Sequence, residues 1–117
     1  MTEQELTALD VAVAKARGYP THDINGRCVI PSSGDVDGIT GWALYQPTRD
    51  PGLCAEIAAE RYIEHDWKQL VQIDKWDAVC AYDVDAPDIT EYTERFADHP
   101  TRIRAWCVAV CRAVAGE

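Results

Sequence analysis

The stretch that decides the fold, residues 101–116, reads TRIRAWCVAVCRAVAG and carries the strongest periodic pattern in the chain. Its apolar side chains recur at steps of three and four positions, as on one face of an α-helix: Ile103, Trp106, Cys107, Val110, Cys111 and Val114. Pro100 precedes the pattern where helices often begin, and Gly116 follows it where they commonly end. The pattern predicts a C-terminal helix with a wide apolar stripe.

Two earlier segments also carry helix signals. Thr2 and Glu5 have the spacing of a capping box, and apolar residues continue at helical spacing as far as Gly18, which predicts a helix over residues 3–17. Asp50 followed by Pro51 resembles a capping residue before the first helical position, where proline costs no hydrogen bond. This pair predicts a second helix that runs to about residue 63.

A first pair of strands is expected between these two helices. Asn25-Gly26 is a turn dipeptide, and the apolar run after it predicts a strand over residues 27–30. A second strand is predicted over residues 39–45. The polar, glycine-containing stretch between them, residues 31–38, is expected to be a loop.

A second strand pair is expected before the C-terminal helix. Alternating residues predict strands over 68–74 and 76–83, joined by a tight turn at Asp74-Lys75. Residues 84–99 contain a proline and few apolar side chains, so they are expected to form a long surface loop with at most one irregular helical turn.

Together these elements define a fold class. The order helix, strand, strand, helix, strand, strand, helix predicts an α+β fold, with a small, mainly antiparallel sheet of about four strands layered with three helices. The chain has 117 residues, 47% of them hydrophobic, which is the size and composition of a single domain spanning residues 1–117.

Charge and cysteine content exclude some classes of protein. The chain has 11 basic and 20 acidic residues and a net charge of −9, which argues against direct binding to nucleic acid. It has neither a signal-peptide pattern nor a run of apolar residues long enough to span a membrane, so we expect a cytoplasmic location. The five cysteines are expected to be free thiols that pack as small apolar groups.

No recognised motif indicates a metal, a cofactor or an active site. Cys107 and Cys111 have a spacing that suits zinc, with His65 or His99 to complete the site, but both lie on the apolar stripe, which favours core packing. Residues 83–94 have the length of a calcium loop but lack its central glycine. No local motif selects a cysteine and histidine pair for nucleophilic catalysis. We therefore expect no enzyme activity, no metal and no cofactor.

The charge is concentrated in one part of the chain. Residues 74–98 contain eight acidic and two basic side chains, a local net charge of −6. A solvated loop is the simpler interpretation. The alternative is a surface that binds a protein partner, with aromatic anchors among the carboxylates: Asp74, Asp77, Tyr82, Asp83, Asp85, Asp88, Glu91, Tyr92, Glu94 and Phe96.

The chain also resembles a known family, the NinX-like phage proteins. Residues 9–18, LDVAVAKARG, look like the family's Leu-Asp-x-x-Val-Ala-x-Ala-x-Gly opening, and residues 45–50 look like its Pro-Ser-Thr-Asp segment. Residues 76–78 are similar to its Trp-x-Ala strand, and residues 101–106 stand where its last helix begins. The Gly-Gly pair of the family's middle helix is reduced here to Gly52. The related phage α-β-α sandwich family is the second choice.

Either resemblance implies a bacteriophage or prophage gene without an established activity. We therefore expect a phage accessory protein in the cytoplasm of a host bacterium that binds a host or phage protein. The acidic segment favours a partner with a basic nucleic-acid groove, such as a CRISPR interference complex of the host defence. The alternatives are an early structural or regulatory phage protein, which binds a phage partner or itself as a homodimer through its helical face, and a small enzyme that uses a cysteine.

Overall fold

A computed structural model describes residues 1–71 and 73–116 of the chain. It is an α+β fold with three helices and two antiparallel sheets of three strands each. The helices are α1 (Glu3–Ala16), α2 (Pro51–Glu60) and α3 (Arg102–Ala115). The first sheet contains β1 (His22–Ile24), β2 (Arg27–Val36) and β3 (Ile39–Leu44). The second contains β4 (Ile63–Lys68), β5 (Ala78–Asp83) and β6 (Tyr92–Arg95), followed by the 3-10 helix η1 (Phe96–Asp98).

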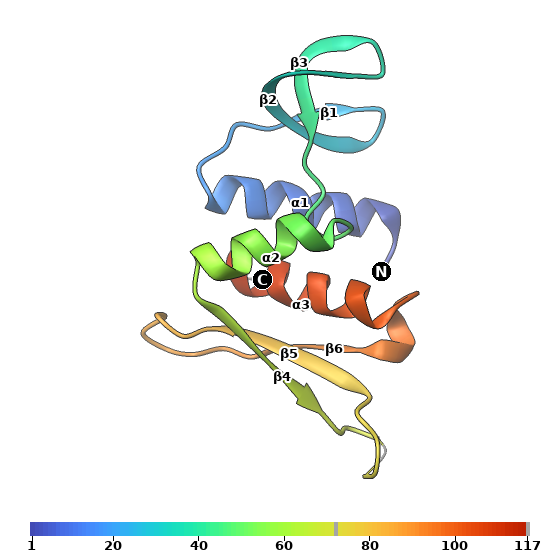
Figure 1. The fold of residues 1–117 in the computed structure, drawn as a ribbon, viewed down its shortest axis with the longest axis vertical. Coiled ribbons are helices and arrows are strands. Elements are labelled where there is room, and N and C mark those ends of the chain that lie inside the picture. Colours follow the sequence, from blue (N-terminus) through green and yellow to red (C-terminus); the bar gives the residue numbers. More distant parts are fainter. Residues whose placement is uncertain (72, 117) are drawn as a thin grey trace.

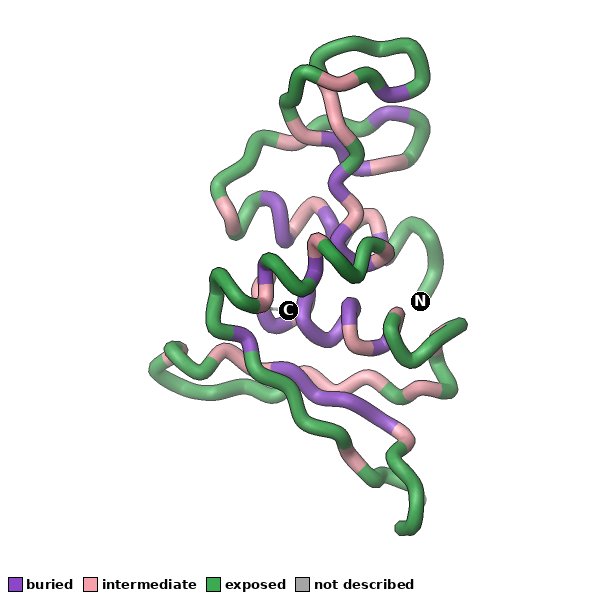
Figure 2. The backbone as a smooth tube through the Cα atoms, in the orientation of Figure 1, coloured by how far each residue is buried: buried purple, intermediate pink, exposed green. Residues whose placement is uncertain are grey.

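The three helices form a middle layer, with one sheet at each end of the molecule (Figure 1). The predicted fold class is therefore confirmed, but the strands number six in the described residues and divide between two sheets, whereas about four in one sheet were expected. The buried positions lie mainly along the helices and the central strand of each sheet (Figure 2).

Helix α3 lies between the other helices and the second sheet. Val108 and Cys111 belong to a buried cluster with α1, whereas Val79 and Ala81 of β5 belong to a second cluster with the opposite side of α3. The predicted helix is confirmed. A single apolar stripe underestimates how much of its surface is buried, because α3 packs against α1 on one side and against β5 on the other. Ile103, expected within the stripe, is 57% exposed.

The first sheet is built from two tight hairpins. Asn25 and Gly26 both have positive φ, 54° and 78°, as the two-residue turn between β1 and β2 requires. Asp37 and Gly38 repeat this geometry between β2 and β3. The predicted loop over residues 31–38 is therefore wrong, because β2 continues to Val36 past an irregularity in its register with β3.

The second sheet begins earlier in the chain than predicted. Helix α2 ends at Glu60, and Tyr62 adopts a positive φ of 55° that turns the backbone, so Ile63 begins β4 and does not end the helix. Strand β4 pairs with β5 from Ile63 opposite Asp83 to Lys68 opposite Ala78.

A hairpin precedes α3 as predicted, but its first strand is β4 and the predicted strand over 68–74 is wrong except at Lys68. Its turn is not a two-residue turn at Asp74-Lys75, because residues 69–71 and 73–77 belong to a longer connection. Within it, the Asp77 carboxylate accepts hydrogen bonds from the amides of Leu70 and Val71, each at 2.6 Å. Gln72, which the predicted strand over 68–74 included, lies outside the described residues.

Part of the predicted loop over residues 84–99 is regular structure. Residues 92–95 form β6, which was missed, and the expected irregular helical turn is η1. Thr101 caps α3 by accepting a hydrogen bond from the amide of Arg104 at 3.1 Å, so the predicted helix start at Pro100 is wrong. The caps predicted at Thr2 and Asp50 are confirmed.

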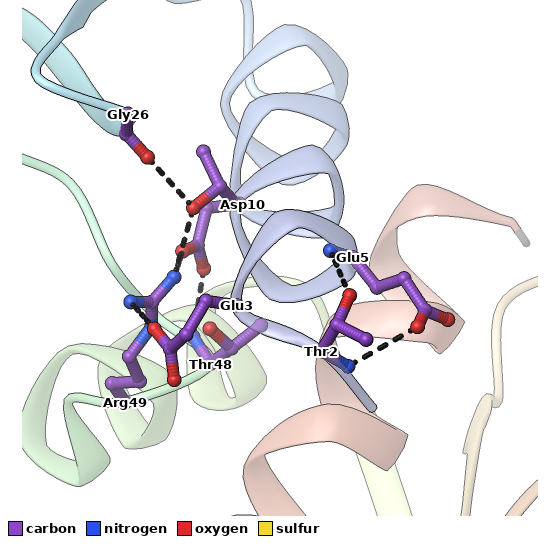
Figure 3. Close-up of polar contacts among 8 residues, drawn as sticks. Thr2, Glu3, Glu5, Asp10, Gly26, Thr48 and Arg49 are labelled. Carbon is purple, nitrogen blue, oxygen red and sulfur yellow. Dashed lines mark hydrogen bonds and ion pairs between the residues drawn. The ribbon is translucent and has the colours of Figure 1, made fainter.

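A buried carboxylate joins α1 to the segment that precedes α2. The side chain of Asp10 is fully buried and accepts a hydrogen bond from the amide of Thr48 at 2.9 Å (Figure 3). Arg49 approaches the second carboxylate oxygen at 3.5 Å and binds Glu3 at 2.6 Å. This network fixes the start of α2 against the middle of α1.

Burial raises the pKa of Asp10 to about 6, although Thr48 and Arg49 lower it. The folded protein therefore binds this proton more tightly than the unfolded chain, so the stabilisation is fully present below the ordinary aspartate pKa of 3.8 and is lost as pH rises through 6. We expect the wild type to lose about 3 kcal/mol of unfolding free energy relative to Asp10→Asn between about pH 4 and 7. Urea denaturation of both proteins across this range measures the difference, and a constant difference would contradict the prediction.

Candidate protein-binding surface

The structure separates the predicted partner-binding residues into three groups. Asp74 and Asp77 lie in the connection between β4 and β5. Asp83 is the last residue of β5, and Asp85 and Asp88 follow it at that opposite end of the strand, about 20 Å away at the usual rise of an extended strand, whereas Glu94 lies in β6 opposite Val79. The acidic segment of the sequence is therefore not one continuous surface.

Three of the predicted residues turn toward α3 and are not free to serve as an acidic surface. The Glu94 carboxylate contacts the His99 ring at 2.9 Å and Arg112 at 2.6 Å, and its side chain is only 15% exposed. The Arg112 guanidinium also lies 5.2 Å from the centre of the Tyr92 ring. Phe96 packs at the edge of Trp67.

Four other predicted residues gather at the end of the sheet where β5 finishes: Tyr82, Asp83, Asp85 and Asp88. Strand β4 starts beside them, with Glu64 opposite Tyr82 and Asp66 two residues further along the strand. We call the surface formed by these residues the acidic surface: Glu64, Asp66, Tyr82, Asp83, Asp85 and Asp88.

The carboxylates of the acidic surface are not neutralised by basic side chains in the described part of the chain. Within residues 1–71 and 73–116, none of the five forms an ion pair with a basic side chain, whereas nearby Glu91 lies 3.7 Å from Lys68. The Tyr82 hydroxyl donates to Asp66 at 3.1 Å, and this hydrogen bond raises the pKa of Tyr82. Five uncompensated negative charges close together attract cationic groups of a partner.

A hollow of about 260 Å³ adjoins the acidic surface. Its lining includes Asp83, Asp88 and Tyr92, together with residues 113–116 at the end of α3. The C-terminal end of a helix carries a partial negative charge, which adds to the two carboxylates. The hollow is therefore suited to a lysine or arginine side chain.

The cysteines offer no prepared nucleophile. All five are buried and form no disulfide. Burial raises the pKa of Cys28 to about 11, and contact with Cys54 together with burial raises the pKa of Cys107, so both thiols are held in the unreactive protonated form. Among the described residues, no three histidine, cysteine or acidic side chains are grouped so that they could hold a metal ion.

Comparison of the chain with models of known protein families, with curated proteins and with solved structures finds no match. No helix in the described part of the chain is long and apolar enough to cross a membrane.

Sequence reasoning found part of the acidic surface but missed Glu64 and Asp66. Asp83, Asp85 and Asp88 stand out as a run of acids in the sequence. Glu64 and Asp66 join them only through strand pairing, whereas the sequence predicts a helix that runs to about residue 63. The alternation of residues 63–68 is the signal that could have revealed an outward-facing pair of acids.

Substitution of Glu94, which contacts α3, should affect stability more than substitution of Asp88, which is exposed. We expect Glu94→Ala to lower the free energy of unfolding by about 1 to 3 kcal/mol, because it removes the carboxylate that contacts both Arg112 and His99. Asp88→Ala should change it by less than about 0.5 kcal/mol, because Asp88 is exposed and has no ion-pair partner among residues 1–71 and 73–116. Urea denaturation at neutral pH measures both, and equal effects would contradict the assignment.

Proposed function

We propose that the protein is a phage or prophage accessory protein that acts in the host cytoplasm by binding a protein partner, without catalysis. The partner we propose is a host defence complex with a basic nucleic-acid groove, and a CRISPR interference complex is the most concrete candidate. The observation that carries the proposal is the acidic surface, whose five carboxylates form no ion pair with a basic side chain of the described residues.

The acidic surface supports such a partner through charge. Complexes that hold guide and target strands line their channels with lysine and arginine to contact phosphates. Carboxylates clustered on β4, at the end of β5 and in the loop that follows can meet the same side chains, and the hollow beside Asp83 and Asp88 offers room for one of them. Binding there would exclude the nucleic acid. The phage assignment itself rests on the resemblance to the NinX-like proteins.

An early structural or regulatory role is the second candidate function. Exposed apolar side chains in the connection between β4 and β5 favour it, since Leu70, Val71 and Ile73 are 53%, 66% and 94% exposed. The apolar residues of α3 are not available for this purpose, because most of them are buried inside the protein. A homodimer would therefore have to form through a surface other than the apolar face of α3.

Charge reversal tests the principal proposal. Glu64, Asp85 and Asp88 are changed together to lysine, and the matched control changes Glu56, Asp74 and Asp98, which are exposed acids elsewhere, so both variants gain the same charge. Immobilised wild type and variants capture proteins from a bacterial lysate at about 50 and 300 mM NaCl, with bound proteins identified by mass spectrometry. We call the variant with lysine at positions 64, 85 and 88 the Glu64 variant. We expect the wild type and the control to retain a nucleic-acid-binding complex at low salt and the Glu64 variant to lose it.

The control separates a specific surface from a general charge effect. Loss of the complex from both variants would show that net charge alone drives binding. Retention of the complex by the Glu64 variant would show that the acidic surface does not contact it, provided that circular dichroism shows both variants to be folded.

A further inference from the structure

A second surface of different chemistry lies between β4 and the beginning of α3. Two adjoining pockets of about 170 and 230 Å³ open there, and Arg102 lines both. We call them together the aromatic groove. The first is lined by His65, Trp67, Arg102, Ile103 and Trp106. The second is lined mainly by Val71, Lys75, Trp76, Asp77, Arg95 and Phe96.

The wall of the groove is formed by aromatic rings in contact with one another. His65 lies 6.0 Å from Trp106 and 5.6 Å from Trp67, and Trp67 lies 5.9 Å from Phe96, measured between ring centres. All of these contacts are edge-on, so the rings support one another and leave the groove preformed. Trp67 nevertheless remains 44% exposed, and Ile103 at the rim is 57% exposed.

Such exposure is unusual for large apolar side chains and is typical of protein interfaces. Tryptophan and arginine are the residues that most often dominate the energy of such interfaces. Each pocket is smaller than a site for a drug-sized molecule. The dimensions therefore suit single side chains presented by another protein.

The groove is locally positive in a chain of net charge −9. Within the described residues, Lys75, Arg95 and Arg102 have no ion-pair partner, and the Arg102 guanidinium stacks 5.1 Å from the centre of the Phe96 ring. Asp77 is the one acid among the lining residues, and its oxygens accept the amides of Leu70 and Val71. The first turn of α3 carries no acidic residue, so the positive end of its dipole is uncompensated there.

We propose that the aromatic groove binds an acidic segment of a partner protein. One aliphatic or aromatic side chain of that segment enters the pocket beside Trp67 and Trp106, and neighbouring carboxylates contact Arg102, Arg95 and Lys75. Charge complementarity selects this occupant, because the uncompensated charges at the groove are cationic. The inference is independent of the proposed function, which uses the opposite face of β4 and a basic partner.

Tryptophan side-chain signals provide a direct test with an internal control. Three of the four tryptophans line the groove, Trp67, Trp76 and Trp106, whereas Trp42 stacks on His22 in the first sheet at 5.2 Å. The probe is a blocked peptide, Gly-Asp-Asp-Leu-Asp-Glu-Gly, titrated into the 15N-labelled full chain. We expect the indole NMR signals of the three groove tryptophans to shift and that of Trp42 to remain in place.

Matched peptides and variants separate the contribution of charge to binding from that of the apolar side chain. A peptide with lysine at each acidic position and one with glycine in place of leucine should leave the signals unchanged. Arg102→Glu should weaken binding about tenfold, since it reverses the charge shared by both pockets. An acidic residue at the start of α3 favours the helix, so this variant is expected to fold. Lys15→Glu makes the same change on α1, outside the groove, and should keep the wild-type affinity.

Four results would overturn the inference. The first is no shift with the acidic peptide at millimolar concentration, and the second is an equal response to the basic peptide. Shifts that depend on protein concentration without peptide would assign the groove to a second copy of the chain. Equivalent shifts with oligothymidylate would assign it to single-stranded nucleic acid, which also uses aromatic and cationic side chains.

Discussion

Helix α3 must bury two opposite sides at once, and both halves of the structure depend on this. Small side chains on one side, Ala105 and Ala109, allow the helix to lie close to the second sheet. Val108 and Cys111 meet α1 on the other side. Because one fourteen-residue helix contributes different side chains to both clusters, it cannot shift toward one partner without opening a cavity against the other. Its position in turn fixes where β4 and its side chains lie.

The two candidate surfaces follow from the pleat of β4, an edge strand of the second sheet. Its residues alternate between the two faces, so Glu64 and Asp66 point away from α3 while His65 and Trp67 line the groove beside it. Strand β5 is central and its residues 78–81 are fully buried, so it offers little contact surface of its own. One six-residue edge strand thus contributes acids to one surface and aromatic rings to the other.

The sequence predicted those elements whose signals are local. The capping box at Thr2, the Asp50-Pro51 helix start and the periodic C-terminal helix depend on residues a few positions apart, and the structure confirms them. Elements that depend on pairing between distant residues were missed or misplaced. Ile63 is an example, because its neighbours in the sequence are consistent with a helix end and only its pairing with Asp83 of β5 places it in a strand. The same holds for the site. Local charge identified Asp83, Asp85 and Asp88, but the neutralisation of Glu94 by Arg112 exists only once α3 packs on β6.

The first sheet has its own small core, so its free energy of local opening can differ from that of the rest of the protein. Ile24, Val29, Val36 and the partly buried Trp42 form a cluster distinct from those that include α3. The sheet meets the helices chiefly around Cys28 and Tyr45. Few buried apolar contacts correspond to a low free energy of local opening, so amide hydrogens of β1 and β3 should exchange with solvent faster than those of β5. Such opening would leave the acidic surface and the aromatic groove intact, since both belong to the opposite end of the molecule.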